Sequence, residues 1–114
     1  MSDNISLSQT SLMAKLFRGF GDKTRLSILN ALKGGSLSVT QIVDKLKLPQ
    51  STVSTHLRCL KDCNLVRSER VSKSMIYSLT SGDISDIIEK ADHLLRKVYL
   101  EIWECVNYKE ENNR

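Results

Sequence analysis

The chain has 114 residues, of which 17 are Lys or Arg and 13 are Asp or Glu, so its net charge is +4 and its pI is about 9.1. This length supports one compact domain over residues 1–114, and a core this small favours dimerisation. No apolar run approaches the roughly 20 residues of a membrane helix, and the N-terminus lacks the basic and apolar blocks of a signal peptide. We therefore expect a cytoplasmic protein with no membrane partner, whose positive charge suits a polyanion.

The first two helices are indicated by the spacing of apolar residues. Residues 8–20 carry apolar side chains three and four positions apart, which is the pattern of an amphipathic helix. Asp22 is a suitable N-cap for a second helix, which Gly34 and Gly35 end.

Residues 38–63 predict a helix, a tight turn and a further helix. Ser38 or Thr40 is placed to cap the first of these helices. The residue before Pro49 avoids the helical region of backbone conformation, which predicts the turn. The helix after the proline ends before Asn64, a residue that tolerates left-handed backbone.

The helix after Pro49 is the predicted DNA-reading element. Val53, Leu57 and Leu60 share one of its faces, because each residue turns the helix by about 100°, and they anchor it to the core. Its other faces carry hydroxyl, amide and guanidinium groups, which hydrogen-bond to base edges and phosphates in a major groove. The predicted DNA-binding residues of this helix are Gln50, Ser51, Thr52, Ser54, Thr55 and Arg58.

Residues 65–79 predict a β-hairpin, because two short extended runs flank a polar turn. Arg67, Arg70 and Lys73 on this hairpin are predicted to bind the DNA backbone or the minor groove. The order of helix, turn, helix and hairpin predicts a winged helix-turn-helix, mainly α with a small β-hairpin wing.

Residues 83–108 predict one long helix with a single apolar stripe, which includes Ile88, Leu95, Val98 and Ile102. A long helix with a continuous apolar stripe needs a partner, and we expect that partner to be the same helix of a second copy. A homodimer presents two equivalent reading helices, so its double-stranded operator should contain an inverted repeat.

The cysteines are Cys59, Cys63 and Cys105. An odd count without an export signal favours reduced thiols over a disulfide framework. Cys59 and Cys63 are four residues apart on one helix, a spacing that lets two sulfurs chelate one soft ion such as cadmium, lead, zinc, copper(I) or trivalent arsenic. Two thiolates are too few for tight binding, which leaves Cys105 as the candidate third ligand. The alternative is that the cysteines only pack, as small apolar side chains.

Four motifs occur in a specific order and spacing: Phe20-Gly-Asp-Lys-Thr-Arg-Leu-Ser-Ile-Leu, Ser51-Thr-Val-Ser-Thr-His-Leu, Asn64-Leu-Val and Ile76-Tyr-Ser-Leu. They resemble the ArsR/SmtB metal-sensing repressors, and the resemblance runs from about Leu12 to Cys105. It implies a homodimer whose fourth helix reads an operator and whose first and last helices, with Leu16 and Phe17 on the first, form the interface. It also implies that metal binding weakens DNA affinity and releases efflux or resistance genes. Asn64 replaces the usual glycine cap, and the wing tip lacks the common glycine.

The cysteine pattern is similar to one subgroup of that family. Many members carry Cys-x-Cys near the third helix, where this chain has Ser38-Val39-Thr40, and others use Asp and His pairs on the last helix, where it offers Asp92-His93. Cys59-Leu-Lys-Asp-Cys63 with a distant Cys105 resembles instead the CmtR-type cadmium/lead sensors. The resemblance implies that Cys59 and Cys63 bind cadmium or lead with Cys105 of the partner subunit. Zinc and arsenic(III) stay open as inducers, and no organic cofactor is expected.

Two other functions compete with that of a metal sensor. One is a thiol redox repressor, in which Arg58 and Lys61 would help to activate a cysteine. The other is a cysteine enzyme, but the sequence offers no base beside a cysteine, no phosphate loop and no carboxylate pair, so we expect no enzymatic activity. His56 is expected to form a structural hydrogen bond and His93 to lie on the surface.

Overall fold

The computed structural model describes the backbone of residues 6–112 and the side chains of residues 6–100. The chain divides into two compact units, Met1–Gly82 and Asp83–Arg114, and each is described by itself. The expected single domain over residues 1–114 stays a prediction. None of the helices in the described part of the chain is long and apolar enough to cross a membrane.

The first two helices begin at side-chain caps. Helix α1 spans Leu7–Phe20 and helix α2 spans Lys23–Leu32. Ser6 caps α1 in a reciprocal capping box with Gln9, and Asp22 caps α2 by accepting the amide of its third residue at 2.9 Å. The predicted first helix and the predicted Asp22 cap are both confirmed.

The predicted helix-turn-helix is present as α3, Val39–Leu46, and α4, Gln50–Asp62. Ser38 is the residue that caps α3, again in a capping box, which settles the choice between Ser38 and Thr40. Pro49 precedes the first residue of α4 and has no side chain that could cap it. The proline thus ends the turn and directly precedes α4.

The C-terminal end of α4 is fixed by a left-handed residue. Asn64 has a φ of 60°, and its amide donates to the carbonyl of Lys61 at 3.0 Å. The amide of Leu65 donates to the carbonyl of Leu60 at 2.9 Å, so the helix ends in a Schellman motif. Asparagine tolerates this conformation without a glycine, as the sequence predicts.

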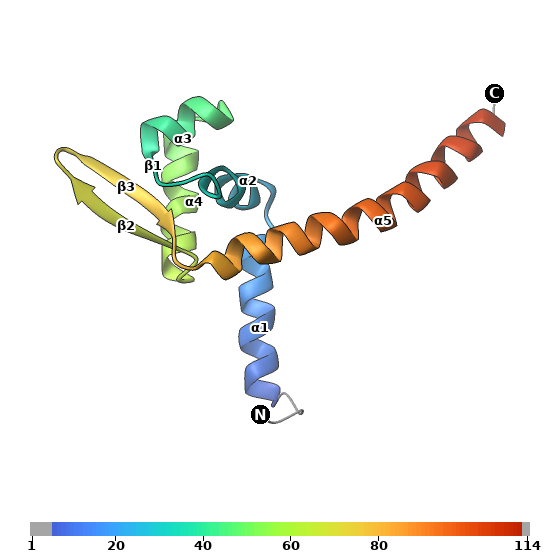
Figure 1. Cartoon of the computed structure of the whole chain (residues 1–114), viewed down its shortest axis with the longest axis horizontal. Helices are drawn as coiled ribbons and strands as arrows, with labels where there is room; N and C mark the ends of the chain where they lie inside the picture. The colour runs from blue at the N-terminus through green and yellow to red at the C-terminus, as the bar shows by residue number, and fades with distance from the viewer. Residues whose placement is uncertain (1–5, 113–114) are drawn as a thin grey trace. The chain divides into compact units, whose positions relative to one another are not determined.

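A three-stranded antiparallel sheet forms the wing, with strand order β1-β3-β2. Strand β2 spans Val66–Val71 and β3 spans Ser74–Leu79, and Figure 1 shows them as a hairpin that projects past the helices. The turn between them places Ser72 at a φ of 59°. Strand β1, Leu37–Ser38, pairs with β3 and is not predicted, because two residues carry no periodic signal.

The core of the first unit lies where α2, α3 and α4 meet. The side chains with no exposed surface there are Ile28 and Leu29 of α2, Ile42 of α3, and Val53, Leu57 and Leu60 of α4. Each such side chain contributes on the order of 1.5–3 kcal/mol through its removal from water. The anchoring face predicted for α4 is therefore confirmed, and its opposite face is held outward.

Gly19 marks a close approach of α1 to the chain after α4. A Cβ atom built on Gly19 would lie 2.8 Å from Cδ1 of Leu65, whose side chain is buried. The terminal methyl of Leu65 can shift, and alanine is favoured over glycine in a helix by about 1 kcal/mol, so we expect Gly19→Ala to lower the free energy of unfolding by only about 1 kcal/mol, less than the usual cost of overpacking. Gly34→Ala is the matched control, because nothing lies within 4 Å of its added Cβ. Equal stabilities of the two variants in urea unfolding would contradict this packing.

Helix α5 spans Gly82–Asn112 and makes up most of the second unit. Near its start, Ile84 and Ile88 are buried, whereas the side chains from position 91 to position 100 are all exposed. The large apolar side chains in that exposed stretch are Leu94, Leu95, Val98, Tyr99 and Leu100. The helix extends to Asn112, beyond the predicted range of 83–108.

Candidate functional site

The outer face of α4 presents the predicted reading side chains to solvent. Gln50, Ser51, Ser54, Thr55 and Arg58 are exposed, and Thr52 is half-buried. The hydroxyl of Thr55 donates to the carbonyl of Ser51 at 2.8 Å, so its hydrogen is used within the helix. Thr55 therefore offers an acceptor oxygen and a methyl group, which suit a donor on a base edge and the methyl of thymine.

The wing supplies exposed positive charge. Arg67 and Arg70 lie on β2, Lys73 lies in the turn, and all three side chains are exposed. Among the residues with described side chains, no carboxylate forms an ion pair with any of them. Their charge is thus available to the phosphates of a nucleic acid.

The wing is joined to the reading helix by a contact that the sequence does not reveal. The ammonium of Lys61, in the last turn of α4, donates to the hydroxyl of Ser68 on β2 at 2.7 Å. From the sequence, Lys61 is expected only to help activate a thiol. A contact between a helix and a strand produces no periodic pattern along the chain, so the partner Ser68 could not be predicted. The bond helps to set the angle between α4 and the wing.

Asp22 connects the start of α2 with α4. Its Oδ2 accepts the amide of Arg25 and lies 3.7 Å from Nδ1 of His56, a contact too long for a hydrogen bond. The amide of Arg25 lowers the pKa of Asp22 below its ordinary value, and the charge of His56 adds to the lowering. The structural hydrogen bond expected for His56 is therefore a longer polar contact.

The lowered pKa of Asp22 has a consequence for stability. A carboxylate whose pKa falls on folding stabilises the protein above its ordinary pKa, here 3.8, and stops doing so as the pH falls through the folded-state pKa. We expect Asp22→Ala to lower the melting temperature by a few degrees at pH 7, and this difference should shrink as the pH falls below 4. Asp22→Asn, which keeps the cap, is the control. A difference that grows in acid would refute the assignment.

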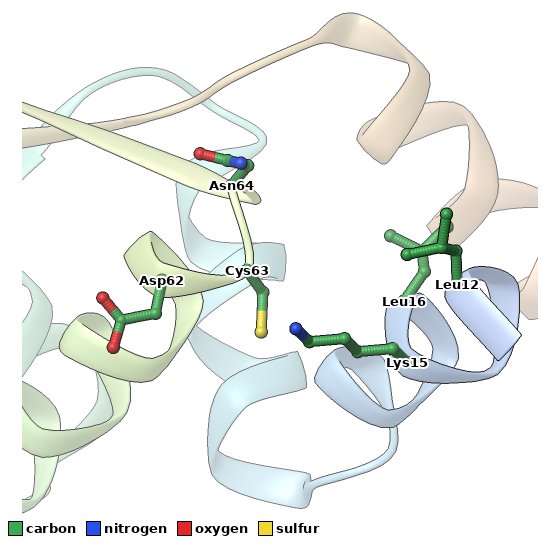
Figure 2. Close-up of a pocket in the computed structure, with 6 residues that line it drawn as sticks. All are labelled: Leu12, Lys15, Leu16, Asp62, Cys63 and Asn64. Carbon is green, nitrogen blue, oxygen red and sulfur yellow. The ribbon is translucent and has the colours of Figure 1, made fainter.

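The two cysteines of α4 are free and half-buried. Cys63 lines a pocket of about 240 Å³ between α1 and the end of α4, together with Leu12, Lys15 and Leu16 of α1. Figure 2 shows the sulfur of Cys63 and the amine of Lys15 pointing toward one another across this pocket. Sequence analysis missed Lys15 as a neighbour of a thiol, because the two residues are far apart in the chain.

The described part of the chain does not complete a metal site by itself. No group of three or more His, Cys, Asp or Glu side chains that could hold a metal ion occurs within it. Cys59 and Cys63 supply two thiols, and the described residues offer no third candidate ligand beside them. Cys105 lies in α5 but outside the residues whose side chains are described, as does Ile102 of the predicted dimer interface.

The other predicted interface residues differ in exposure. Phe17, Leu95 and Val98 are 56%, 57% and 43% exposed, and Leu16 is half-buried. Ile88 is 8% exposed, and its place in the dimer interface stays a prediction. Large apolar side chains are thus exposed on α1 and, in the second unit, on α5 between positions 94 and 100.

The antiparallel wing and the α3–turn–α4 unit with its exposed polar face define a winged helix-turn-helix DNA-binding protein. A family model for bacterial regulatory proteins of the arsR family matches residues 22–68. An HTH-type transcriptional regulator of Methanocaldococcus jannaschii, MJ1325, is 39% identical over 82 residues, which cover 71% of this chain and 92% of the relative. The chain belongs to the ArsR/SmtB family of transcriptional repressors.

Two further similarities support the same assignment. A homologue of the transcriptional repressor SmtB from Synechocystis is 35% identical over 91 residues, covering 79% of this chain and 69% of the relative. The solved structure of Rv0081 from Mycobacterium tuberculosis matches with a TM-score of 0.77 and 27% identity, covering 84% of this chain and 97% of that one. The M. jannaschii and Synechocystis relatives are transcriptional regulators by name, in agreement with the expectation that the chain is not an enzyme.

Proposed function

We propose that the protein is a metal-responsive repressor, which binds operator DNA as a homodimer and releases it when a thiophilic ion binds Cys59 and Cys63. One observation carries the proposal: two half-buried free thiols lie four residues apart, Cys59 on α4 and Cys63 at its C-cap, and the outer face of this helix presents the polar side chains. An ion held by these sulfurs acts directly on the position of the reading helix.

The names of two relatives support a soft metal ion as the inducer. A CadC homologue of Staphylococcus aureus, a cadmium resistance regulatory protein, is 31% identical over 80 residues. A probable mercury resistance operon repressor of Streptomyces lividans is 33% identical over 75 residues. Cadmium and mercury are soft ions that prefer thiolate ligands. We therefore expect cadmium or lead as the inducer, with zinc and arsenic(III) as alternatives, and efflux or resistance genes as targets.

The donor set fits such an ion in part. Two thiols four residues apart on a helix can share one ion, and we propose Cys105 of the partner subunit as the third ligand. When bound, the ion would hold all three sulfurs as thiolates. Cys59 and Cys63 would attach the C-terminal end of α4 to the ion, and Cys105 would attach the ion to the last helix of the partner subunit.

The DNA-binding surface of the proposal consists of α4 and the wing. In a homodimer, two copies of α4 enter successive major grooves, which requires an operator with an inverted repeat. The exposed hydroxyl and amide groups of α4 would read base edges, and Arg67, Arg70 and Lys73 would contact phosphates or the minor groove. Substitutions on α4 should therefore change the preference for one DNA sequence over another, whereas substitutions on the wing should weaken binding to all sequences.

A comparison of Thr55→Ala with Arg67→Ala tests this division. Thr55→Ala should change the preference for operator over random DNA, because a mismatched base contact typically costs about 1–3 kcal/mol. Arg67→Ala should weaken binding to both DNAs and reduce the salt slope by about one. Fluorescence anisotropy at several salt concentrations measures both effects. Equal losses on operator and random DNA for Thr55→Ala would exclude it as a base reader.

A thiol redox repressor is the second candidate, because Cys63 is half-buried and lines a pocket between α1 and the end of α4. Oxidants react with cysteines that they can reach, and such a pocket gives access to the sulfur. The solved structure of reduced HlyU from Vibrio cholerae is 29% identical, with a TM-score of 0.68. Metal titration of the reduced protein separates the candidates, since thiolate-to-metal absorption with operator release supports the metal sensor. Release by peroxide alone supports the redox sensor.

A further inference from the structure

The junction between α1 and α2 holds a set of polar groups that neither the metal site nor the DNA surface uses. Asp22 stands at this junction as the cap of α2. Its Oδ2 accepts the amide of Arg25 at 2.9 Å, and the same oxygen lies 3.7 Å from Nδ1 of His56. One carboxylate oxygen thus serves both the start of α2 and a side chain of α4.

Arg25 closes the junction from the other side. Its Nη2 donates to the carbonyl of Arg18 at 2.9 Å, and its Nε donates to the carbonyl of Gly19 at 3.2 Å. Both carbonyls belong to the last turn of α1, where backbone acceptors lack partners within the helix. These two hydrogen bonds connect the end of α1 with the start of α2. They therefore help to fix the position of Asp22, which lies between the two helices and faces His56.

His56 stands beside Thr55 on α4, and its side chain is 24% exposed. Its neighbours in the sequence, Thr55 and Leu57, belong to the outer face and the buried face of the helix. His56 thus lies at the border between the two faces. A polar contact at this border adds a directional constraint on the rotation of α4 about its own axis to the one that its packed, buried face imposes.

An imidazole nitrogen that faces a carboxylate carries a proton in both the cation and the favoured neutral tautomer. The contact between Asp22 and His56 is therefore attractive in either state. Of the charged groups at this junction, the carboxylate of Asp22 is the one within ion-pair distance of His56, and Arg25 is engaged with α1.

We propose that Asp22 and His56 are positioning residues for DNA recognition: their contact sets the rotation of α4 and so aims its outer face at the base edges. The proposal rests on α4 being the reading helix. It assigns His56 no contact with DNA and no role as a metal ligand. Its effect is on the choice between operator and random DNA, which share the same phosphates.

The variants separate a positioning role from a purely structural one. Asparagine is as good a helix cap as aspartate, so Asp22→Asn keeps α2 intact while it removes the charge that faces His56. His56→Leu removes the donor. His56→Asn keeps a donor, because its amide nitrogen lies about where Nδ1 was, and so serves as the conservative rescue.

The measurement is the ratio of affinities for operator and random DNA, taken on metal-free protein together with the melting temperature. We expect His56→Leu and Asp22→Asn each to lower this ratio by up to about fivefold, because an ion pair between partly exposed groups is weak. We expect His56→Asn to keep most of it, and Asp22→Asn to keep the melting temperature. The double variant should lose no more than either single one, because both remove the same contact.

Three results would overturn the proposal: an unchanged ratio in His56→Leu or Asp22→Asn, additive losses in the double variant, or equal ratios in His56→Asn and His56→Leu. If His56→Leu fails to fold, Asp22→Asn decides alone. Thr55→Ala distinguishes the two levels of failure. If Thr55→Ala changes the ratio and the Asp22 and His56 variants do not, only the positioning role is wrong. If none of them changes it, Thr55 is not a base reader either, and the proposed reading role of α4 fails at that position as well.

Discussion

Replacing Leu95 with Glu should turn the proposed homodimer into a monomer at micromolar concentration. Leu95 is 57% exposed in the single chain and lies in the long apolar stretch of α5 that has no cover within the described residues. A carboxylate buried without a partner in a dimer interface costs on the order of 3 kcal/mol, which raises the dimer dissociation constant about 100-fold. Analytical ultracentrifugation over a concentration series measures this shift.

Lys97→Gln is the matched control for charge, because it changes the net charge by −1, as Leu95→Glu does. Position 97 is two residues, about 200°, from position 95, so its side chain leaves α5 on the opposite side. The control should dimerise like the parent protein. A Leu95→Glu protein that remains dimeric at micromolar concentration, or a control that dissociates equally, would move the dimer interface away from this face of α5.

The second large effect concerns the switch. Cys59→Ser and Cys63→Ser should each abolish the release of operator by cadmium, because each leaves one thiolate on α4. Both variants should bind operator normally without metal, since neither side chain belongs to the exposed reading face. The coupling that is lost should correspond to about 1–3 kcal/mol, or roughly 5- to 150-fold in operator affinity. Operator affinity with and without cadmium, under reducing conditions, gives the value for each variant.

Cys105→Ser divides the roles of the three cysteines. It leaves two thiolates, so weak metal binding should persist while the release of DNA becomes poor. If cadmium makes the Cys59→Ser and Cys63→Ser proteins release operator to the same extent as the parent protein, the proposed metal site is wrong. The region of Asp92 and His93 on α5 would then be the next place to search for ligands.

Much of the fold could be predicted from the sequence because its signals are local. Asp22 and Ser38 are caps next to the helices they start, and Asn64 is the left-handed residue that ends α4. The buried face of α4 follows from the helical period alone. The same period predicts which side chains of α4 are exposed, so the candidate DNA-reading residues follow from the order of amino acids along that helix.

The remaining features depend on residues that the fold brings together. Lys15 faces Cys63 across the pocket between α1 and α4, and Asp22 meets His56 from a different helix. No periodicity or capping rule joins positions so far apart in the sequence. The exposure of a side chain also depends on the fold. Ile88 and Leu95 both belong to the apolar stripe of α5, but only the structure shows that Ile88 is 8% exposed and Leu95 57% exposed.

The metal response of the reduced parent protein is the most direct test of the proposed function. Operator affinity should be high without metal and should fall about 5- to 150-fold when cadmium or lead is added, because metal and operator would favour different positions of α4. Zinc and arsenic(III) complete the series and rank the inducers. If none of these ions changes operator affinity while the reduced protein still binds operator specifically, the protein is a repressor that responds to a signal other than these metals.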